Sequence, residues 1–342
     1  MRRAVLDLAS PRPVWAIPDA TVEAVRQAFG RGWEIVSVAA PASSDGDGAA
    51  GSGEAVQAAH GAEVYAGWGV PPAVMAAGSG VLRWVHTAAA GVGASITPAL
   101  RATGARLTNS AGVHAEPIAD WVVTAIGFWL RGFPAALRAQ AEQRWAKDEF
   151  TNGSVPVREL AGTRVGIVGL GGIGRAVARR CAALGMEVAA VRRHPTRARP
   201  AGVGWVGGPG KLTTLARRSD VLVLAAPQTA DTKGLVSAAI LTALPRGAYV
   251  INVARGGLLD EDALRRALDD GQVGGCALDV FAREPLAHGH PFWRHPRVLV
   301  FPHVSAVSAR FWARETALLV DNVARYRSGR RLRNLVNLEL GY

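Results

Sequence analysis

The chain has 342 residues, of which 49% are hydrophobic and 19% charged, and its formal net charge is +12. Single hydrophobic cores stop growing near about 250–300 residues, so the length predicts two domains, and the hydrophobic fraction excludes wholesale disorder. Arginine supplies almost all of the positive charge, because the only lysines are Lys147, Lys211 and Lys233. We expect small anionic ligands rather than nucleic acid, since the arginines are scattered and form no long basic block.

Membrane and secretory segments are not expected either. The most apolar run, WVVTAIGFWL, stops at Arg131, well short of the roughly 20 residues that span a bilayer. The basic start of the chain is interrupted by Asp7 and shows no cleavage pattern. Cys181 and Cys276 form no short-spaced pair, so we expect no disulfide framework and a reducing, cytoplasmic setting.

The first part of the chain alternates strands and helices. Short apolar runs alternate with helical patterns in the order strand 3–9, helix 19–29, strand 33–40, strand 62–69, short helix to 75, strand 82–93 and strand 105–110. A glycine- and serine-rich stretch, residues 43–53, has no apolar spacing, and we interpret it as a mobile surface loop without chemistry. A long helical pattern over residues 115–132, with Pro117 in its first turn, then leads to a second domain.

The second part begins after an arm, residues 142–160, that we expect to be extended. Strands are expected at 163–170, 187–191, 220–227, 248–254, 274–281 and 297–302, and helices from 173 and at 211–218, 238–245, 260–271 and 309–329. This alternation of strands and helices predicts an α/β protein with two Rossmann-like domains of parallel sheets. The expected dinucleotide-binding domain, residues 113–307, is inserted into a flavodoxin-like substrate domain made of residues 1–112 and 308–342.

A glycine triplet follows the strand at 163–170. Gly169, Gly171 and Gly174 have the G-x-G-x-x-G spacing and open a helix. This spacing allows a tight turn, close approach of the backbone to a pyrophosphate, and close packing of helix on sheet. The alternative is a glycine-rich structural turn, but the strand, helix and second strand around it favour dinucleotide binding.

The second strand of this unit ends in an unusual pair. An acidic residue there would accept hydrogen bonds from the adenine ribose, whereas this chain has Arg192 and Arg193. Guanidinium groups bind a ribose 2′-phosphate through charge-assisted hydrogen bonds. We therefore expect NADP(H) to be preferred, with NAD(H) possible; the alternative is that both arginines are merely solvated.

Three further segments carry Arg255, Glu284 and His303, in INVARGGLLDEDAL, ALDVFAREPL and FPHVSA. Taken singly, the arginine could cap a helix, and the other two could be structural loop residues. Together with the glycine turn, in this order and spacing, they resemble the D-isomer-specific 2-hydroxyacid dehydrogenase family over nearly the whole chain. Within that family, YAGWGVPPAV, the two arginines and PFWRHPRVLVFPHVSAVS look most like NADPH-dependent glyoxylate/hydroxypyruvate reductases.

The resemblance implies a role for each residue. Arg255 would bind the substrate carboxylate and carbonyl oxygen, and His303 would protonate that oxygen during reduction. Glu284 would orient the imidazole and favour its protonated form. Further positions match binding residues of the family: Ala90 and Gly91 for the substrate carboxylate, Trp68 at the pocket mouth or merely at the domain edge, and Gly172, Ile173, Pro227, Val253, Ala254 and Asp279 for the cofactor.

Some alternatives stay open. A metal site at His288, His290 and His295 is not expected, because no cysteine or carboxylate set accompanies these histidines. Asp120 stands where related chains commonly carry glutamate. A dinucleotide-binding regulator of the same fold, like the corepressors that resemble this family, is the alternative to an enzyme. We expect a homodimer, on account of the long helix at 115–132 and the arm that follows it.

Overall fold

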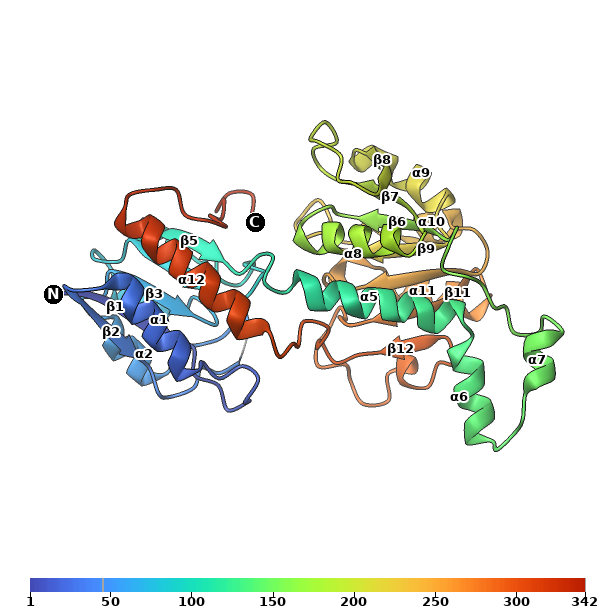
Figure 1. Cartoon of the computed structure of the whole chain (residues 1–342), viewed down its shortest axis with the longest axis horizontal. Helices are drawn as coiled ribbons and strands as arrows, with labels where there is room; N and C mark the ends of the chain where they lie inside the picture. The colour runs from blue at the N-terminus through green and yellow to red at the C-terminus, as the bar shows by residue number, and fades with distance from the viewer. Residues whose placement is uncertain (45, 342) are drawn as a thin grey trace. The chain divides into compact units, whose positions relative to one another are not determined.

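The computed structural model describes residues 1–44 and 46–341, which form two compact units (Figure 1). Unit 1 comprises Met1–His114 and Val307–Tyr342, and unit 2 comprises Ala115–Ala306. These limits lie within two residues of the boundaries expected from the sequence. Which ligand each unit binds stays a prediction. None of the helices in the described ranges is long and apolar enough to cross a membrane.

Unit 1 is built on a sheet of five parallel strands in the order β2-β1-β3-β4-β5, the flavodoxin-like order. Its strands are β1 (Arg2–Asp7), β2 (Trp33–Ser37), β3 (Val64–Gly67), β4 (Trp84–Thr87) and β5 (Arg106–Asn109). Its helices are α1 (Asp19–Phe29), α2 (Gly53–Ala59), α3 (Pro72–Ala77), α4 (Pro98–Thr103) and α12 (Phe311–Arg327). The last helix, α12, returns to this unit and packs beside α1 (Figure 1), as its length predicts.

The glycine-rich stretch after β2 differs from our expectation. Ala49 is buried in the same cluster as Trp68, and the stretch is closed at its base, where Ser43 N donates to Ala50 O at 3.0 Å. Ser43 Oγ also accepts from Ala50 N at 2.8 Å. Most of the stretch lies at the surface as expected, but Ala49 is buried; Asp45 lies outside the described residues.

Unit 2 is built on a sheet of seven parallel strands in the order β12-β11-β10-β9-β6-β7-β8. Its strands are β6 (Arg164–Val168), β7 (Glu187–Val191), β8 (Val203–Gly207), β9 (Val221–Leu224), β10 (Ala248–Asn252), β11 (Val273–Leu278) and β12 (Val298–Val300). Its α-helices are α5 (Ala115–Leu130), α6 (Phe133–Ala141), α7 (Lys147–Thr151), α8 (Gly172–Ala183), α9 (Leu212–Arg217), α10 (Ala238–Ala243) and α11 (Glu261–Asp269). Short 3₁₀ helices occupy Pro209–Lys211, Gly256–Leu258 and Pro291–Trp293.

The apolar strands of unit 2 are covered on both faces. In β9, Val221 and Val223 belong to the core cluster that includes α5 and α8, whereas Leu222 and Leu224 belong to the cluster on the other face. A strand buried on both faces reads as a continuous apolar run rather than an alternating one. That is why VLVL predicted a parallel sheet with helices on both sides.

Three of the strands and α-helices of unit 2 were not expected. In the edge strand β8, Gly204 and Gly207 interrupt the run of apolar residues, so the sequence pattern indicates a strand only weakly. The helix α6 begins just after Gly132, where the sequence pattern indicated that the preceding helix ends. Figure 1 shows α6 and α7 extending away from the sheet. Because α7 lies within residues 142–160, the arm is partly helical rather than extended throughout.

Candidate active site and cofactor site

Three neighbouring strands of unit 2 bring the predicted catalytic residues to one edge of the sheet. β10, β11 and β12 are parallel and adjacent, so their carboxyl ends lie at the same edge. Arg255 follows β10, Glu284 follows β11, and His303 follows β12. Residues far apart in sequence therefore meet, as they do in α/β proteins whose sites form outside the carboxyl ends of strands.

The imidazole of His303 is paired with a carboxylate. Its Nδ1 lies 2.8 Å from Glu284 Oε2, and the other carboxylate oxygen, Oε1, accepts from Phe281 N at 2.9 Å. Burial by itself would raise the pKa of Glu284, but these two hydrogen bonds, with the positive charges of His303 and Arg255, outweigh burial and lower it. Glu284 is thus held as a carboxylate that fixes the ring, and Nε2 is left as the nitrogen available to a substrate.

The backbone at His303 is held by a buried aspartate. His303 has a φ of 58°, in the left-handed region that costs energy for residues other than glycine. Asp279 Oδ1 accepts from Val304 N at 2.8 Å and Ser305 N at 3.1 Å, and Oδ2 accepts from the Ser305 hydroxyl. The expected contact of Asp279 with the cofactor stays a prediction, but its carboxylate also fixes the turn that carries the imidazole.

Arg255 lies on a turn fixed by close backbone packing. A Cβ on the next residue, Gly256, would lie 1.8 Å from the carbonyl carbon of Phe281, so only glycine fits. Buried Asn252 braces the turn, because its Oδ1 accepts from Ala254 N at 3.0 Å and its Nδ2 donates to Arg255 O at 3.1 Å. Sequence reasoning missed Asn252, although a polar residue inside the apolar run AYVINVA was a usable signal. Arg255 itself is exposed.

The glycine turn after β6 fits a dinucleotide phosphate. A Cβ on Gly174 would lie 1.9 Å from Gly169 O, and Gly169 itself has a φ of 100° and touches the backbone of Ala225 after β9. A Cβ on Gly171, by contrast, would meet nothing within 4 Å. Two glycines therefore serve packing, and the third leaves open space at the start of α8.

The other predicted cofactor residues lie around this turn and at neighbouring strand ends. Gly171 caps α8 without a side-chain hydrogen bond, so the N–H groups of the first turn, at Gly172 and Ile173, are available to an anion. Pro227 follows β9, and Val253 and Ala254 follow β10 as buried residues. The residues present fit a dinucleotide at this end of the sheet.

The two arginines after β7 have different surroundings. Arg192 folds back on its own loop, where Nη2 donates to Arg197 O and to Ala198 O, the latter at 3.2 Å. Arg193 pairs with Asp231 at 3.3 Å, and the aspartate side chain is 82% exposed. An ion pair this exposed is weak.

The predicted substrate residues of unit 1 lie after β3 and β4. Ala90 O accepts from Asn109 Nδ2 at 2.7 Å, which fixes the loop that carries Ala90 and Gly91. Within the described residues, the N–H groups of Ala90 and Gly91 donate to no protein acceptor. These two donors are therefore available to a carboxylate.

Trp68 is a correction to the sequence analysis. Its side chain is buried, 2% exposed, and stacks on Phe311 at a centroid distance of 5.8 Å, with Trp15 and Trp312 against its edges. It belongs to the core of unit 1 and not to a pocket mouth. The misplacement arose because a large aromatic residue in a loop between glycines gives no periodic signal of burial.

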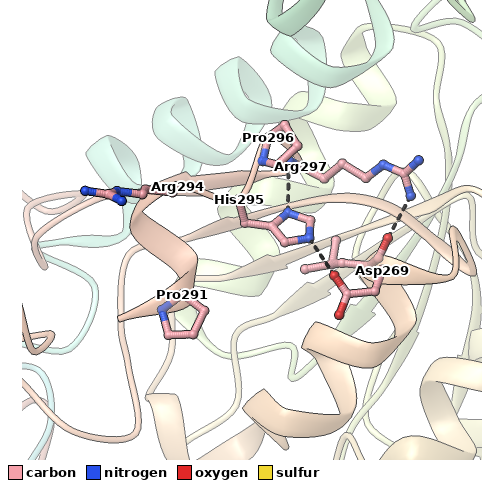
Figure 2. A pocket seen from close by; sticks show the side chains of 7 residues that line it. Asp269, Pro291, Arg294, His295, Pro296 and Arg297 are labelled. Carbon is pink, nitrogen blue, oxygen red and sulfur yellow. Dashed lines mark hydrogen bonds and ion pairs between the residues drawn. The ribbon is translucent and has the colours of Figure 1, made fainter. Parts of the chain in front are cut away.

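A hollow on unit 2 lies apart from the catalytic residues. It has a volume of about 480 Å³ and is lined by Leu268, Asp269, Pro291, Arg294, His295, Pro296 and Arg297. Figure 2 shows His295 pointing at Asp269, and its Nε2 lies 3.3 Å from Asp269 Oδ1. His290 instead caps a 3₁₀ helix through Phe292 N. Over residues 1–44 and 46–341, no group of three potential ligands is arranged to hold a metal.

A phosphate-binding turn at the switch point of the sheet and an imidazole–carboxylate pair in the same unit define the class: a dehydrogenase that uses a nicotinamide dinucleotide. Residues 123–305 match the family description "D-isomer specific 2-hydroxyacid dehydrogenase, NAD binding domain". The chain belongs to this family. It is an NAD(P)-dependent D-2-hydroxyacid dehydrogenase, and a non-enzymatic regulator of the same fold is not favoured.

Relatives and solved structures agree with this assignment. The chain is 31% identical to glyoxylate/hydroxypyruvate reductase A of Serratia proteamaculans, over 80% of this chain and 85% of the relative. It is 33% identical to glycerate dehydrogenase of Methylorubrum extorquens, over 73% of this chain and 77% of the relative. One similar solved structure is a D-isomer specific 2-hydroxyacid dehydrogenase from Xanthobacter autotrophicus Py2, in complex with NADPH and MES. The match covers 100% of this chain and 99% of that chain, with a TM-score of 0.80 and 31% identity. The NADPH-dependent glyoxylate/hydroxypyruvate reductase of Sinorhizobium meliloti, solved with NADP and sulfate, has a TM-score of 0.79 at 28% identity and full coverage of both chains.

Replacing the imidazole tests its role as proton donor. His303→Ala should reduce kcat by about 10²–10⁴-fold, the range of general acid–base catalysis, because no group then protonates the carbonyl oxygen. Cofactor affinity, followed by nucleotide fluorescence, should change little. His295→Ala is the matched control, since it breaks a second imidazole–carboxylate pair away from the site. Full activity of His303→Ala would disprove the assignment.

The lowered pKa of Glu284 predicts how its contribution to stability depends on pH. A carboxylate with a lowered pKa stabilises the folded state above its unfolded pKa, about 4.3, and this contribution is lost as pH falls through the folded value. The Tm difference between wild type and Glu284→Gln should therefore shrink as pH falls below about 4.3.

A neighbouring carboxyl group gives the control. Burial raises the pKa of Glu261, despite the hydrogen bond that Glu261 accepts from Ala282 N. A raised pKa favours the folded state at low pH, and this contribution is lost as pH rises through the folded value. Glu261→Gln should therefore show the opposite trend in Tm. The same trend in both variants would contradict the pairing of Glu284 with His303.

Proposed function

We propose that this enzyme reduces glyoxylate or hydroxypyruvate with NADPH as its preferred cofactor, and that NADH serves less well. The observation that carries the proposal is the 2.8 Å pairing of His303 Nδ1 with Glu284, beside the exposed Arg255. The reductases of Serratia proteamaculans and Sinorhizobium meliloti described above support the substrate class by their names. The arginines after β7 support the cofactor preference.

The chemistry follows from the charges at the site. Arg255 binds the carboxylate and carbonyl oxygen of the 2-oxo acid through its planar set of donors, which lowers the electron density at the carbonyl carbon. On unit 1, the N–H groups of Ala90 and Gly91 are donors available to a carboxylate. NADPH, when bound, would supply a hydride to the carbonyl carbon. His303 Nε2 delivers a proton to the carbonyl oxygen, which gives the 2-hydroxy acid. Glu284 stabilises the imidazolium before the transfer.

The cofactor preference rests on local charge. A ribose 2′-phosphate carries negative charge that a carboxylate after β7 would repel. Arg193 already pairs with an anionic group, the carboxylate of Asp231, whose side chain is 82% exposed. Arg192 contributes positive charge and braces its loop through the carbonyls of Arg197 and Ala198. In this proposal Arg193 makes the direct contact with the phosphate.

We also propose a homodimer, formed through α6 and the arm that follows it. Phe133 and Leu137 on α6 are each 52% exposed, and Trp145 is 92% exposed. Large apolar side chains exposed together on one projecting segment are typical of interaction surfaces. We further infer a cytoplasmic enzyme, in keeping with two free, buried cysteines, Cys181 and Cys276.

Exchanging the arginines tests the cofactor preference. Arg192→Asp/Arg193→Ala should raise KM for NADPH by tenfold or more and leave KM for NADH within about threefold, because each charge-assisted hydrogen bond contributes about 1.5–3 kcal/mol. Initial rates with glyoxylate and hydroxypyruvate measure this. Arg265→Ala, which removes an exposed, paired arginine on α11, is the control. A wild-type preference for NADH would disprove the phosphate role and retain the enzyme.

The dimer has its own test. Trp145→Ser combined with Phe133→Ser should convert the dimer to a monomer in size-exclusion chromatography with light scattering. Trp293→Ser is the control, because Trp293 is 49% exposed but lies outside the arm. A wild type that is monomeric at micromolar concentration would contradict the proposal.

A further inference from the structure

The glycine-rich stretch after β2 lies directly on the loop that follows β3. A Cβ on Gly69 would lie 2.6 Å from Ala49 O and 2.9 Å from Asp47 O. Ala49 itself is 4% exposed. Residues 46–51 are therefore packed against the rest of unit 1 rather than projecting from it.

The carboxylate of Asp47 binds the backbone of a second loop. Its Oδ2 accepts from Ala94 N at 2.7 Å, and its Oδ1 accepts from Ser95 N at 3.0 Å and from the Ser95 hydroxyl. Ser95 is fully buried. Hydrogen bonds to an ionised acceptor are roughly twice as strong as neutral ones, so this carboxylate fastens residues 94 and 95 firmly.

Residues 94 and 95 end the loop that carries the proposed substrate donors. At the start of this loop, Thr87 Oγ1 accepts from Ala89 N at 3.2 Å, and Asn109 Nδ2 donates to Ala90 O at 2.7 Å. At its end, Ser95 N also donates to Val92 O at 3.2 Å, which makes a turn that Asp47 holds from outside. The N–H groups of Ala90 and Gly91 lie between these two anchors.

We infer that Asp47 is a positioning residue for substrate recognition: it fixes residues 92–95 and so holds the N–H groups of Ala90 and Gly91 where a 2-oxo acid carboxylate binds. This inference rests on the proposed function. Asp47 does not touch the substrate, since both of its oxygens are already occupied by N–H and O–H donors of Ala94 and Ser95. Its loss should weaken binding of the substrate without changing proton transfer.

The test is Asp47→Asn, which keeps the shape of the side chain but replaces one acceptor oxygen by a donor. KM for glyoxylate should rise about tenfold, with kcat and KM for NADPH each within about twofold of wild type. Backbone amides of residues 91–95 should exchange hydrogen faster, whereas amides of unit 2 should not change. The unit 2 amides also report that the variant is folded.

Glu54→Gln is the matched control. Glu54 lies in the same region and accepts from two backbone N–H groups, Ala39 at 3.1 Å and Ala40 at 2.9 Å. Among the described residues, it forms no hydrogen bond with residues 92–95. Its kinetic constants and its exchange at 91–95 should equal those of wild type. An equal rise in KM in both variants would overturn the inference, because general loosening of the region would then explain the effect.

Two other outcomes would also overturn the inference about Asp47. Unchanged exchange at residues 91–95 in Asp47→Asn would overturn the positioning role, and faster exchange with an unchanged KM would overturn its link to the substrate. If the wild type turns over neither glyoxylate nor hydroxypyruvate, the proposed function fails. The exchange rates of the two variants then decide the positioning role by themselves.

Discussion

The contact of Gly256 with the backbone of Phe281 and Ala282 is the constraint on which the catalytic geometry depends. A Cβ there would lie 1.8 Å from one backbone carbon and 2.1 Å from the next nitrogen. The chain leaving β10 therefore lies against the chain leaving β11. Arg255, one residue before the contact, and Glu284, a few residues after it, are thereby brought within electrostatic reach of each other.

At the same edge of the sheet, two carboxylates fix His303 in different ways. Glu284 contacts the imidazole ring of His303, while Asp279 contacts the backbone that follows it. One fixes the orientation of the ring and the other fixes an uncommon backbone conformation. Because both carboxylates are anchored by N–H donors, the imidazole is preorganised, which spares the reaction the cost of ordering it.

Unit 1 follows a related principle with the charges reversed. In unit 2, carboxylates hold a cation-forming group, whereas in unit 1 the carboxylate of Asp47 holds a loop whose remaining N–H groups are available to an anion. The excess of arginine adds a general attraction for such anions but does not choose among them.

Prediction from the sequence worked best where the signal was local. The glycine spacing at 169–174 and the apolar run VLVL each describe neighbours along the chain, and both led to the correct elements. The strand β8 was missed because Gly204 and Gly207 dilute its apolar pattern. The site residues after β10, β11 and β12 were found as motifs, but the distances between them required the parallel order of three strands.

The sequence by itself determined the fold class, the dinucleotide turn and the set Arg255, Glu284 and His303, because each depends on residue type and spacing. The tertiary structure decided the burial of Trp68 and the hydrogen-bond partners of Arg192, Asp47 and Asp279. These depend on contacts between residues distant along the chain, and Asp47 and Ala94 are 47 residues apart. An aspartate is the same letter in a sequence whether its carboxylate is solvated or hydrogen-bonded to a distant backbone. Only the folded structure shows which of the two it is.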